Sequence, residues 1–178
     1  MPSLECSKIE FELTYLAQEI PAETEGLVPT RILDVYIPAD LNVHSHLRLR
    51  RSGDKCEITK KVPLDENDAS AQVEYTIPLE IAEFDALSSV SNKRIEKDRS
   101  RAMIEGRQTE VDVFQGLLKG LVTIEFEFAN EQEKQGFSPP SCCLADVTQE
   151  DFLAGGNLAG KSYTDIVSDL QRYGYRPL

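Results

Sequence analysis

Alternation of apolar and polar residues is the clearest pattern in this chain, and it recurs in short segments from one end to the other. Within each segment, side chains two residues apart share a chemical character, which is typical of β-strands with one buried face. Stretches containing glycine, proline or acidic residues separate the segments. We therefore predict eight strands, over residues 8–16, 31–37, 44–51, 56–61, 72–77, 95–101, 109–114 and 121–129.

The segment from residue 44 to residue 61 predicts a β-hairpin with one basic face. Arg48 and Arg50 alternate with two leucines in its first strand, and Lys61 lies on the polar face of the returning strand. Residues 52–54, Ser-Gly-Asp, supply the turn. A row of cations on a rigid sheet can bind a run of phosphates. A charged hairpin face can equally be exposed to solvent and bind nothing, so the hairpin alone leaves both interpretations open.

The remaining segments are predicted to be loops or helices. Proline is favoured in the first turn of a helix, so Pro78 predicts a helix start. Ser162 with Asp165 resembles a capping box and predicts the start of the terminal helix. The predicted elements are loops at 17–29 and 64–71, a helix from Pro78 with an apolar stripe of Ile81, Phe84 and Leu87, a short helix capped by Thr148, and a terminal helix at 162–173. Residues 1–178 thus predict one domain of the α+β class, mainly antiparallel β.

Charge and composition narrow the classes of function. The net charge of −12 argues against general affinity for a nucleic acid duplex or an anionic membrane. The 19 lysines and arginines are not scattered, however, because six lie in residues 48–61 and six more in residues 93–107. An acidic protein that concentrates its cations in this way is better suited to hold a small anion inside the fold.

Several features indicate a protein of the cytoplasm. No apolar run approaches the roughly 18 residues that a membrane helix needs, and the first residues lack the layout of a secretory signal. Cys142 and Cys143 are adjacent, which is too close for an ordinary disulfide, so a reducing compartment is expected. We interpret His44 and His46 as strand residues rather than as metal ligands.

The polar faces of the predicted strands are sorted by the sign of their charge. Two strands carry paired glutamates, Glu10 with Glu12 and Glu125 with Glu127, whereas other strands carry the cations. In a closed antiparallel barrel these faces would line one lumen. Carboxylates there could bind Mg²⁺ or Mn²⁺, and the cations could bind phosphate oxygens. The alternative is an ordinary salt-bridged sheet surface. The cations concerned are Arg48, Arg50, Lys61, Lys97 and Arg99.

An ordered set of short motifs makes the chain resemble the CYTH superfamily, also called the triphosphate tunnel metalloenzymes. Each motif is weak alone, but together they span residues 9 to about 161 in the order of that family. They are Glu10-x-Glu12, Arg48-x-Arg50, Ile58-Thr59-x-Lys61, a Glu74 strand leading into Ile77-Pro78, Lys97-x-Arg99, Glu110-x-Asp112-x-Phe114, Glu125-x-Glu127, Asp146-Val147-Thr148 and Asn157-Leu158-Ala159.

The resemblance implies an eight-stranded closed tunnel barrel with flanking helices and a C-terminal helix. It also implies Mg²⁺- or Mn²⁺-dependent hydrolysis of inorganic triphosphate or a related triphosphate. For the oligomeric state, the sequence leaves both a monomer and a homodimer open. Glu10 and Glu12 would have catalytic roles and would bind the metal together with Glu125 and Glu127. The substrate-binding cations would be Arg48, Arg50, Lys61, Lys97, Arg99 and Lys161. We expect these cations to repel one another in an empty tunnel.

The chain departs from the family pattern at three places. Thr14 stands where the first motif has a lysine, Thr76 stands where an acid is common, and an aromatic residue is missing near Cys142. The loss of a cation at Thr14 favours the main alternative, a non-catalytic module that binds polyphosphate or nucleotides. Thiamine triphosphatase and adenylate cyclase relatives are further alternatives, although no specific element for recognising a base is evident.

Overall fold

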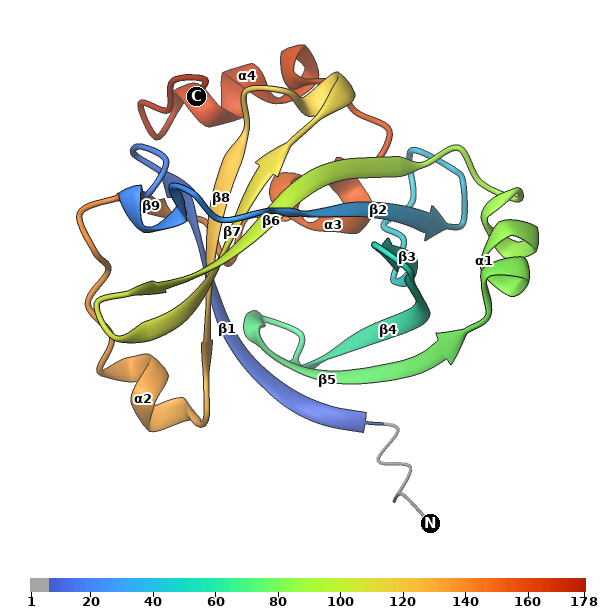
Figure 1. Ribbon diagram of the computed structural model, residues 1–178, viewed down its shortest axis with the longest axis horizontal. Coiled ribbons are helices and arrows are strands. Elements are labelled where there is room, and N and C mark those ends of the chain that lie inside the picture. Colours follow the sequence, from blue (N-terminus) through green and yellow to red (C-terminus); the bar gives the residue numbers. More distant parts are fainter. Residues whose placement is uncertain (1–6) are drawn as a thin grey trace.

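The computed structural model describes residues 7–178 and consists mainly of β-strands (Figure 1). The prediction about an N-terminal signal falls partly on residues 1–6, outside the described residues. The strands are β1 (Ser7–Ala17), β2 (Thr30–Ile37), β3 (Leu47–Ser52), β4 (Lys55–Asp65), β5 (Asp68–Leu79), β6 (Arg94–Ile104), β7 (Arg107–Phe114), β8 (Val122–Phe128) and β9 (Cys143–Asp146). The helices are α1 (Ile81–Ser88), α2 (Glu131–Gln135), α3 (Gly155–Leu158) and α4 (Tyr163–Gln171), with 3-10 turns η1 (Ala22–Thr24), η2 (Gly116–Leu118) and η3 (Asp151–Leu153).

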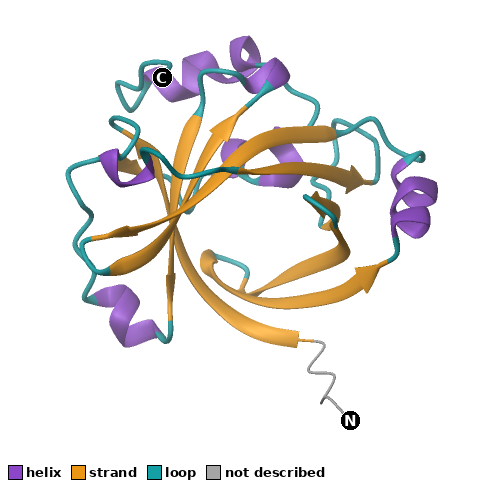
Figure 2. Cartoon of the chain, viewed as in Figure 1, coloured by secondary structure: helices purple, strands orange, loops and turns teal. Residues whose placement is uncertain are grey.

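Eight of the strands form a closed antiparallel barrel. The strand order is β5-β4-β3-β2-β6-β7-β8-β1, and pairing of β1 with β5 closes the ring. β1 pairs with β5 through residues 7–11 and with β8 through residues 11–16, while β9 pairs with residues 15–17 and lies outside the ring. The predicted tunnel barrel is confirmed. The helices lie mostly around the rim of this continuous sheet (Figure 2).

The apolar faces of the strands point outward and are covered in patches. Phe84 of α1 packs with Val35 and Leu49 of two neighbouring strands. Ile166 and Leu170 of α4 belong to the largest buried cluster. Because the apolar side chains are buried outside the ring, the polar faces are left to line its interior.

Two of the expected boundaries between elements are wrong. The predicted loop at 64–71 is instead the tip of the β4–β5 hairpin, where Asn67 N donates a hydrogen bond to Asp65 Oδ1 at 2.9 Å. Pro78 lies in β5, opposite Glu57, and does not begin a helix. The helix begins at Ile81 because Glu80 forms a capping box there.

Three predicted helical features have mixed outcomes. In α1 only Phe84 of the expected apolar stripe is buried, since Ile81 and Leu87 are exposed. Thr148 caps no helix, because its hydroxyl accepts a hydrogen bond from Thr14 N at 2.9 Å. The capping box of the terminal helix is confirmed at Ser162.

Two further expectations concern cysteines and membrane helices. Cys142 and Cys143 are free thiols in the structure. Within residues 7–178, no helix is long and apolar enough to cross a membrane.

Candidate active site in the tunnel

The interior of the barrel holds a cavity of about 740 Å³, called the tunnel below. Its walls are the inward rows of strands β1 to β8, with part of the segment that runs from Val147 to Leu158 at one side. The side chains on these rows are mostly charged. The cations are Arg48, Arg50, Lys61, Lys97, Arg99 and Arg101, and the acids on the strands are Glu10, Glu12, Asp34, Glu57, Glu74, Glu110, Glu125 and Glu127.

Asp34 of β2 holds the two arginines of β3. Arg50 binds the Asp34 carboxylate with two hydrogen bonds of 2.7 Å, from Nε and Nη2. Arg48 Nε lies 4.0 Å from Asp34 Oδ1, is buried, and has no hydrogen-bond partner among the described residues. Burial alone would raise the pKa of Asp34, but attraction to Arg50 holds that pKa well below its usual range. Arg48 therefore has a buried donor available for an anion in the tunnel.

Asp112 of β7 organises a second group of cations. It is fully buried and accepts hydrogen bonds from Lys97 Nζ and from Arg99, whose Nε lies 2.6 Å from Oδ1. Arg99 Nη2 also contacts Glu125 Oε2 at 2.8 Å, and Arg99 Nη1 binds Glu110. Burial would raise the pKa of Asp112, but Lys97 and Arg99 outweigh burial and lower that pKa to about 2.

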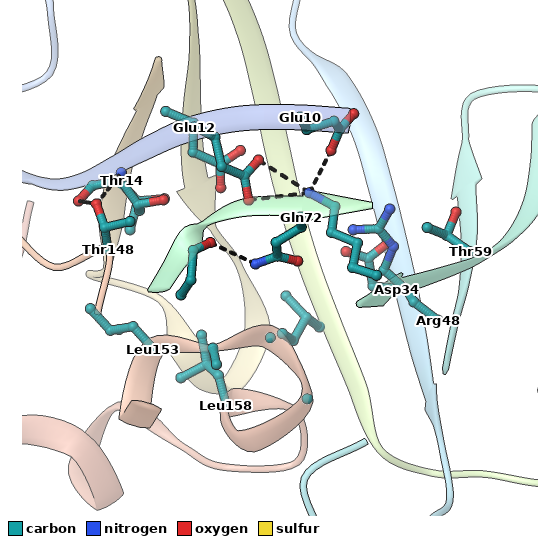
Figure 3. Close-up of a pocket in the computed structure, with 18 of the residues that line it drawn as sticks. Glu10, Glu12, Thr14, Asp34, Arg48, Thr59, Gln72, Thr148, Leu153 and Leu158 are labelled. Atoms are coloured by element: carbon teal, nitrogen blue, oxygen red, sulfur yellow. Dashed lines mark hydrogen bonds and ion pairs between the residues drawn. The ribbon is translucent and has the colours of Figure 1, made fainter. Parts of the chain in front are cut away.

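Lys61 of β4 lies at the centre of a third group, and its two glutamate partners, Glu10 and Glu12, are labelled in Figure 3. Its ammonium contacts Glu10 Oε2 at 2.9 Å and Glu12 Oε2 at 3.1 Å. Burial would raise the pKa of Glu10, but Lys61, helped by Lys8, lowers it to about 2. The expected repulsion between the cations is offset in part, because Arg50, Lys61, Lys97 and Arg99 each have a carboxylate partner within 3 Å. Some repulsion remains, since burial lowers the pKa of Lys97 and the neighbouring Arg99 lowers it further.

The carboxylates of β1 and β8 are the candidate metal ligands. Glu12 lies directly opposite Glu127 in the strand pairing, and Glu125 lies opposite Thr14 one step along. Like charges directly opposite each other are unfavourable, which a bound cation would relieve. Among residues 7–178, no three acidic, histidine or cysteine side chains form a ready metal cluster. The donors still fit Mg²⁺ or Mn²⁺, because Mg²⁺ typically keeps several waters and is bound by one or two carboxylates plus substrate phosphates.

Comparisons with known proteins decide the family. An inorganic triphosphatase from Nitrosomonas europaea is 33% identical to this chain over 143 residues, which cover 79% of this chain and 90% of the relative. The chain belongs to the CYTH superfamily, the triphosphate tunnel metalloenzymes. No model of a known protein family matches the chain.

Solved structures agree with this placement in the CYTH superfamily. A crystal structure of an inorganic triphosphatase matches with a TM-score of 0.61 and 28% identity, over 84% of this chain and 93% of the other. A putative adenylate cyclase from Bacillus halodurans matches with a TM-score of 0.54 over 97% of this chain and 94% of the other. Its 16% identity supports the shared fold alone.

Within this CYTH tunnel, nearly all residues singled out from the sequence come together. The two ExE pairs, the RxR pair, Lys61 and the KxR pair all line the cavity, and so does Thr14. Lys161 does not line it, because the chain has already left the tunnel after α3, and its charge lies near Lys93 and Asp165. His44 and His46 line the tunnel but precede β3, so they are not strand residues.

The sequence interpretation gave no role to several of the acids that hold the cations. Asp34 and Asp112 are the main ones, with Glu110 and Glu74 beside them. A signal was present for Glu110 and Asp112, which alternate on one face of their strand. Asp34 gave no such signal, since its partner Arg50 becomes its neighbour only when β2 and β3 pair.

The lowered pKa values predict a specific response to acid. Glu10 and Asp112 have ordinary pKa values of 4.5 and 3.8, and both fall to about 2 in the folded protein. A group with a depressed folded pKa stabilises the fold above its unfolded pKa, and this stability is lost as the pH falls through the folded value. We therefore expect the urea midpoint to be level from pH 7 to about pH 5 and to fall steeply between about pH 4.5 and pH 2. A midpoint that is unchanged at pH 2.5 would contradict the ion pairs described above.

Proposed function

We propose that this protein is a metal-dependent hydrolase of inorganic triphosphate or a related triphosphate, bound inside the tunnel. The observation that carries the proposal is the tunnel itself, with its sorted cations and the buried, unpartnered Nε of Arg48. The relationship to an inorganic triphosphatase supports it. Hydrolysis of a phosphoric anhydride depends chiefly on positioning and on charge neutralisation, so no serine or cysteine nucleophile is required.

The roles of the tunnel residues follow from their position and charge. Arg48, Arg50 and Lys61, with Lys97 and Arg99, would bind the phosphate chain by exchanging their carboxylate partners for phosphate oxygens. Glu125 and Glu127, with help from Glu10 and Glu12, would hold Mg²⁺ or Mn²⁺. When bound, the metal supplies further positive charge at the phosphate oxygens. A glutamate of β1 would orient the attacking water in line with the leaving phosphate, because a carboxylate accepts hydrogen bonds from water.

One substrate panel tests the proposal. The pure protein is incubated with inorganic triphosphate, ATP and thiamine triphosphate, each with Mg²⁺, with Mn²⁺ and with excess chelator, and phosphate release is measured. Metal-dependent release from at least one compound is the expected result. Binding of these compounds without any release would favour a non-catalytic polyphosphate- or nucleotide-binding module. Release of pyrophosphate with a cyclic nucleotide from ATP would favour a cyclase.

The non-catalytic alternative depends on Thr14, which lines the tunnel opposite Glu125. A lysine at this position would add a cation beside the phosphates, and a hydrogen bond to a charged group contributes roughly 1.5–3 kcal/mol. Because the new lysine would also contact Glu125, we expect Thr14→Lys to tighten triphosphate binding by only about fivefold to tenfold. Calorimetry with inorganic triphosphate in chelator measures this.

The control for the Thr14 experiment is Thr164→Lys, which adds the same charge to the exposed surface of α4. An equal gain in both variants would show a general charge effect. A gain in Thr14→Lys alone, accompanied by faster hydrolysis, supports an enzyme slowed by the loss of the lysine. Tighter binding without hydrolysis supports the binding module.

A further inference from the structure

Two neighbouring cysteines, which the proposed function does not use, lie side by side outside the ring of strands. Cys142 is only 7% exposed, and Cys143, the first residue of β9, is partly exposed. Consecutive residues of a regular strand point to opposite faces of the sheet. Here both side chains pack instead against one buried cluster, which includes Tyr15 and is contacted by Phe137. The two thiols therefore share one environment.

A turn directly before β9 explains this arrangement. Cys143 N donates a hydrogen bond to Pro140 O at 3.0 Å, which closes the turn, and Cys143 lies opposite Ala17 of β1. Cys142 is therefore a turn residue, and its side chain does not have to follow the alternation of the strand. The register between β9 and β1 also shifts next to this pair of residues, as in a β-bulge. Both thiols can thus lie on the same side of the chain.

The peptide bond between the two cysteines is held from both sides. Cys142 O accepts a hydrogen bond from Gln18 N at 2.6 Å, and Cys143 N donates to Pro140 O. Consecutive Cα atoms are only about 3.8 Å apart, closer than an ordinary disulfide allows. A disulfide between the two residues would have to twist this peptide against both hydrogen bonds. The structure therefore favours the dithiol, and both thiols are free.

The groups around the pair disfavour a charged centre. Burial raises the pKa of both thiols, that of Cys143 to about 12, and the contact between them raises the pKa of Cys143 and lowers that of Cys142. Glu19 and Glu23 raise the pKa of Cys142, and Glu105 raises that of Cys143. Within residues 7–178, no third acidic, histidine or cysteine side chain completes a metal cluster with the pair. A ligand that binds two sulfur atoms and leaves a neutral product suits this environment.

We propose that Cys142 and Cys143 form a binding site for trivalent arsenic that carries one organic group. Thiol sulfur is a soft ligand, and such an arsenic centre is completed by two sulfur atoms. In water the reagent carries two hydroxyl groups on arsenic. Two As–O bonds break and two As–S bonds form, and each thiol proton leaves with a hydroxyl group as water. Arsenic stays trivalent and the product is neutral. An arsenic atom also spans a wider gap between the sulfur atoms than a disulfide bond does, so the peptide can keep its hydrogen bonds.

Phenylarsine oxide is the probe for this site. The folded chain is incubated with one equivalent, and its intact mass is measured in excess glutathione, a monothiol. The expected product has gained one phenylarsenic group and lost two hydrogens, resists glutathione and is released by dithiothreitol, a dithiol.

Variants with a single thiol test whether both cysteines bind the arsenic. Cys142→Ala and Cys143→Ala should each raise the Kd for the reagent by about a hundredfold or more, because the second thiol binds as an intramolecular partner. Cys56→Ala is the matched control, since Cys56 is also a buried free cysteine, and it should keep the adduct. None of these measurements depends on hydrolysis of a triphosphate.

Three results would overturn the site. An adduct that resists glutathione in either single-thiol variant shows that the two cysteines do not act together. An adduct that forms in urea but not on the folded chain shows that the fold does not present the pair. A loss of two hydrogens from the pair after treatment with glutathione disulfide replaces the site by a redox pair.

A mapping experiment covers the case in which a single-thiol variant does not fold, as judged by its melting temperature. The adduct of the native chain is unfolded in urea and treated with iodoacetamide, and the alkylated residues are identified by peptide mass spectrometry. Protection of both Cys142 and Cys143 with alkylation of Cys56 supports the site. Alkylation of either member of the pair overturns it.

Discussion

Glutamine in place of Glu125 or Glu127 should lower triphosphate hydrolysis by about a hundredfold or more, the scale typical of a lost electrostatic contact to the reacting group. Glutamine keeps the size of each side chain but removes the negative charge that a hard divalent cation requires. Both residues lie on β8 and line the tunnel, with Glu127 opposite Glu12 of β1. The rate of phosphate release under saturating Mg²⁺ and Mn²⁺ measures the effect.

Binding should behave differently from turnover in these variants. Glu125 holds Arg99 in an ion pair of 2.8 Å, so Glu125→Gln removes one of the three carboxylates that compete with phosphate for this cation. Metal-free binding of triphosphate should therefore survive or tighten. Glu96→Gln is the matched control, because Glu96 lies on the exposed side of β6, where it pairs with Arg31. Full activity in both tunnel variants, or in excess chelator, would contradict the proposal that Glu125 and Glu127 bind a metal required for hydrolysis.

The second large effect is on stability. Asp112→Asn should lower the free energy of unfolding by about 3–5 kcal/mol, because it leaves Lys97 buried without its carboxylate partner and removes one of the three carboxylates that bind Arg99. For a chain of this size the loss corresponds to a fall in melting temperature of about 6–20 °C. Thermal denaturation followed by circular dichroism at pH 7 measures it. At pH 2.5, where Asp112 itself begins to be protonated, the difference from the native chain should shrink.

A partly exposed aspartate provides the matched control for Asp112. Asp98 lies on the adjacent strand β6 and pairs with Arg31 at 3.1 Å on the outside of the barrel. A surface ion pair of this kind contributes about 0–1 kcal/mol, so Asp98→Asn should change the melting temperature by only a few degrees. If both variants melt at the same temperature, Asp112 is not the electrostatic centre that its burial indicates.

The alternation of side chains was enough to predict the barrel and most of the tunnel wall. Glu10, Glu12 and Thr14 were placed on one inward row, and all three line the cavity. The face of the strand on which each residue lies is strongly determined, because a shift of one residue would bury every charge of the row in the apolar layer. The same alternation placed Arg48 and Arg50 inside.

The pairing of those charges could not be predicted from alternation. Asp34 and Arg50 lie on strands whose register is fixed only by pairing, and Arg99 reaches Asp112 and Glu125 across two strand boundaries. Alternation along a strand shows which face a side chain occupies. It does not show the register, that is, which residue of the neighbouring strand lies opposite. The carboxylate partners that offset the expected repulsion between the cations were missed for this reason.

Local sequence signals gave two wrong predictions, a loop at residues 64–71 and a helix that begins at Pro78. Residues 64–71 contain four acidic or amide side chains, which suggested a loop, but a turn with Asn67 at its tip is sufficient there. Pro78 suggested the first turn of a helix, yet a proline near the end of a strand is tolerated where its missing N–H is not needed. Tertiary pairing with β4 decided both cases.

The late pairing of β1 has a consequence for how the protein is made. β1 is the first strand that the structure describes, yet its partners are β5, β8 and β9, and β8 and β9 are the last two strands that it describes. A ribosome adds roughly 5–20 residues per second, so β1 waits on the order of ten seconds before Phe126 and its neighbours emerge. Closure of the ring therefore has to wait until β8 has been synthesised, and it forms many contacts between residues distant in sequence, which is typical of slow folding. Until that step the tunnel has no enclosed interior, and nascent chains have no place to hold a ligand.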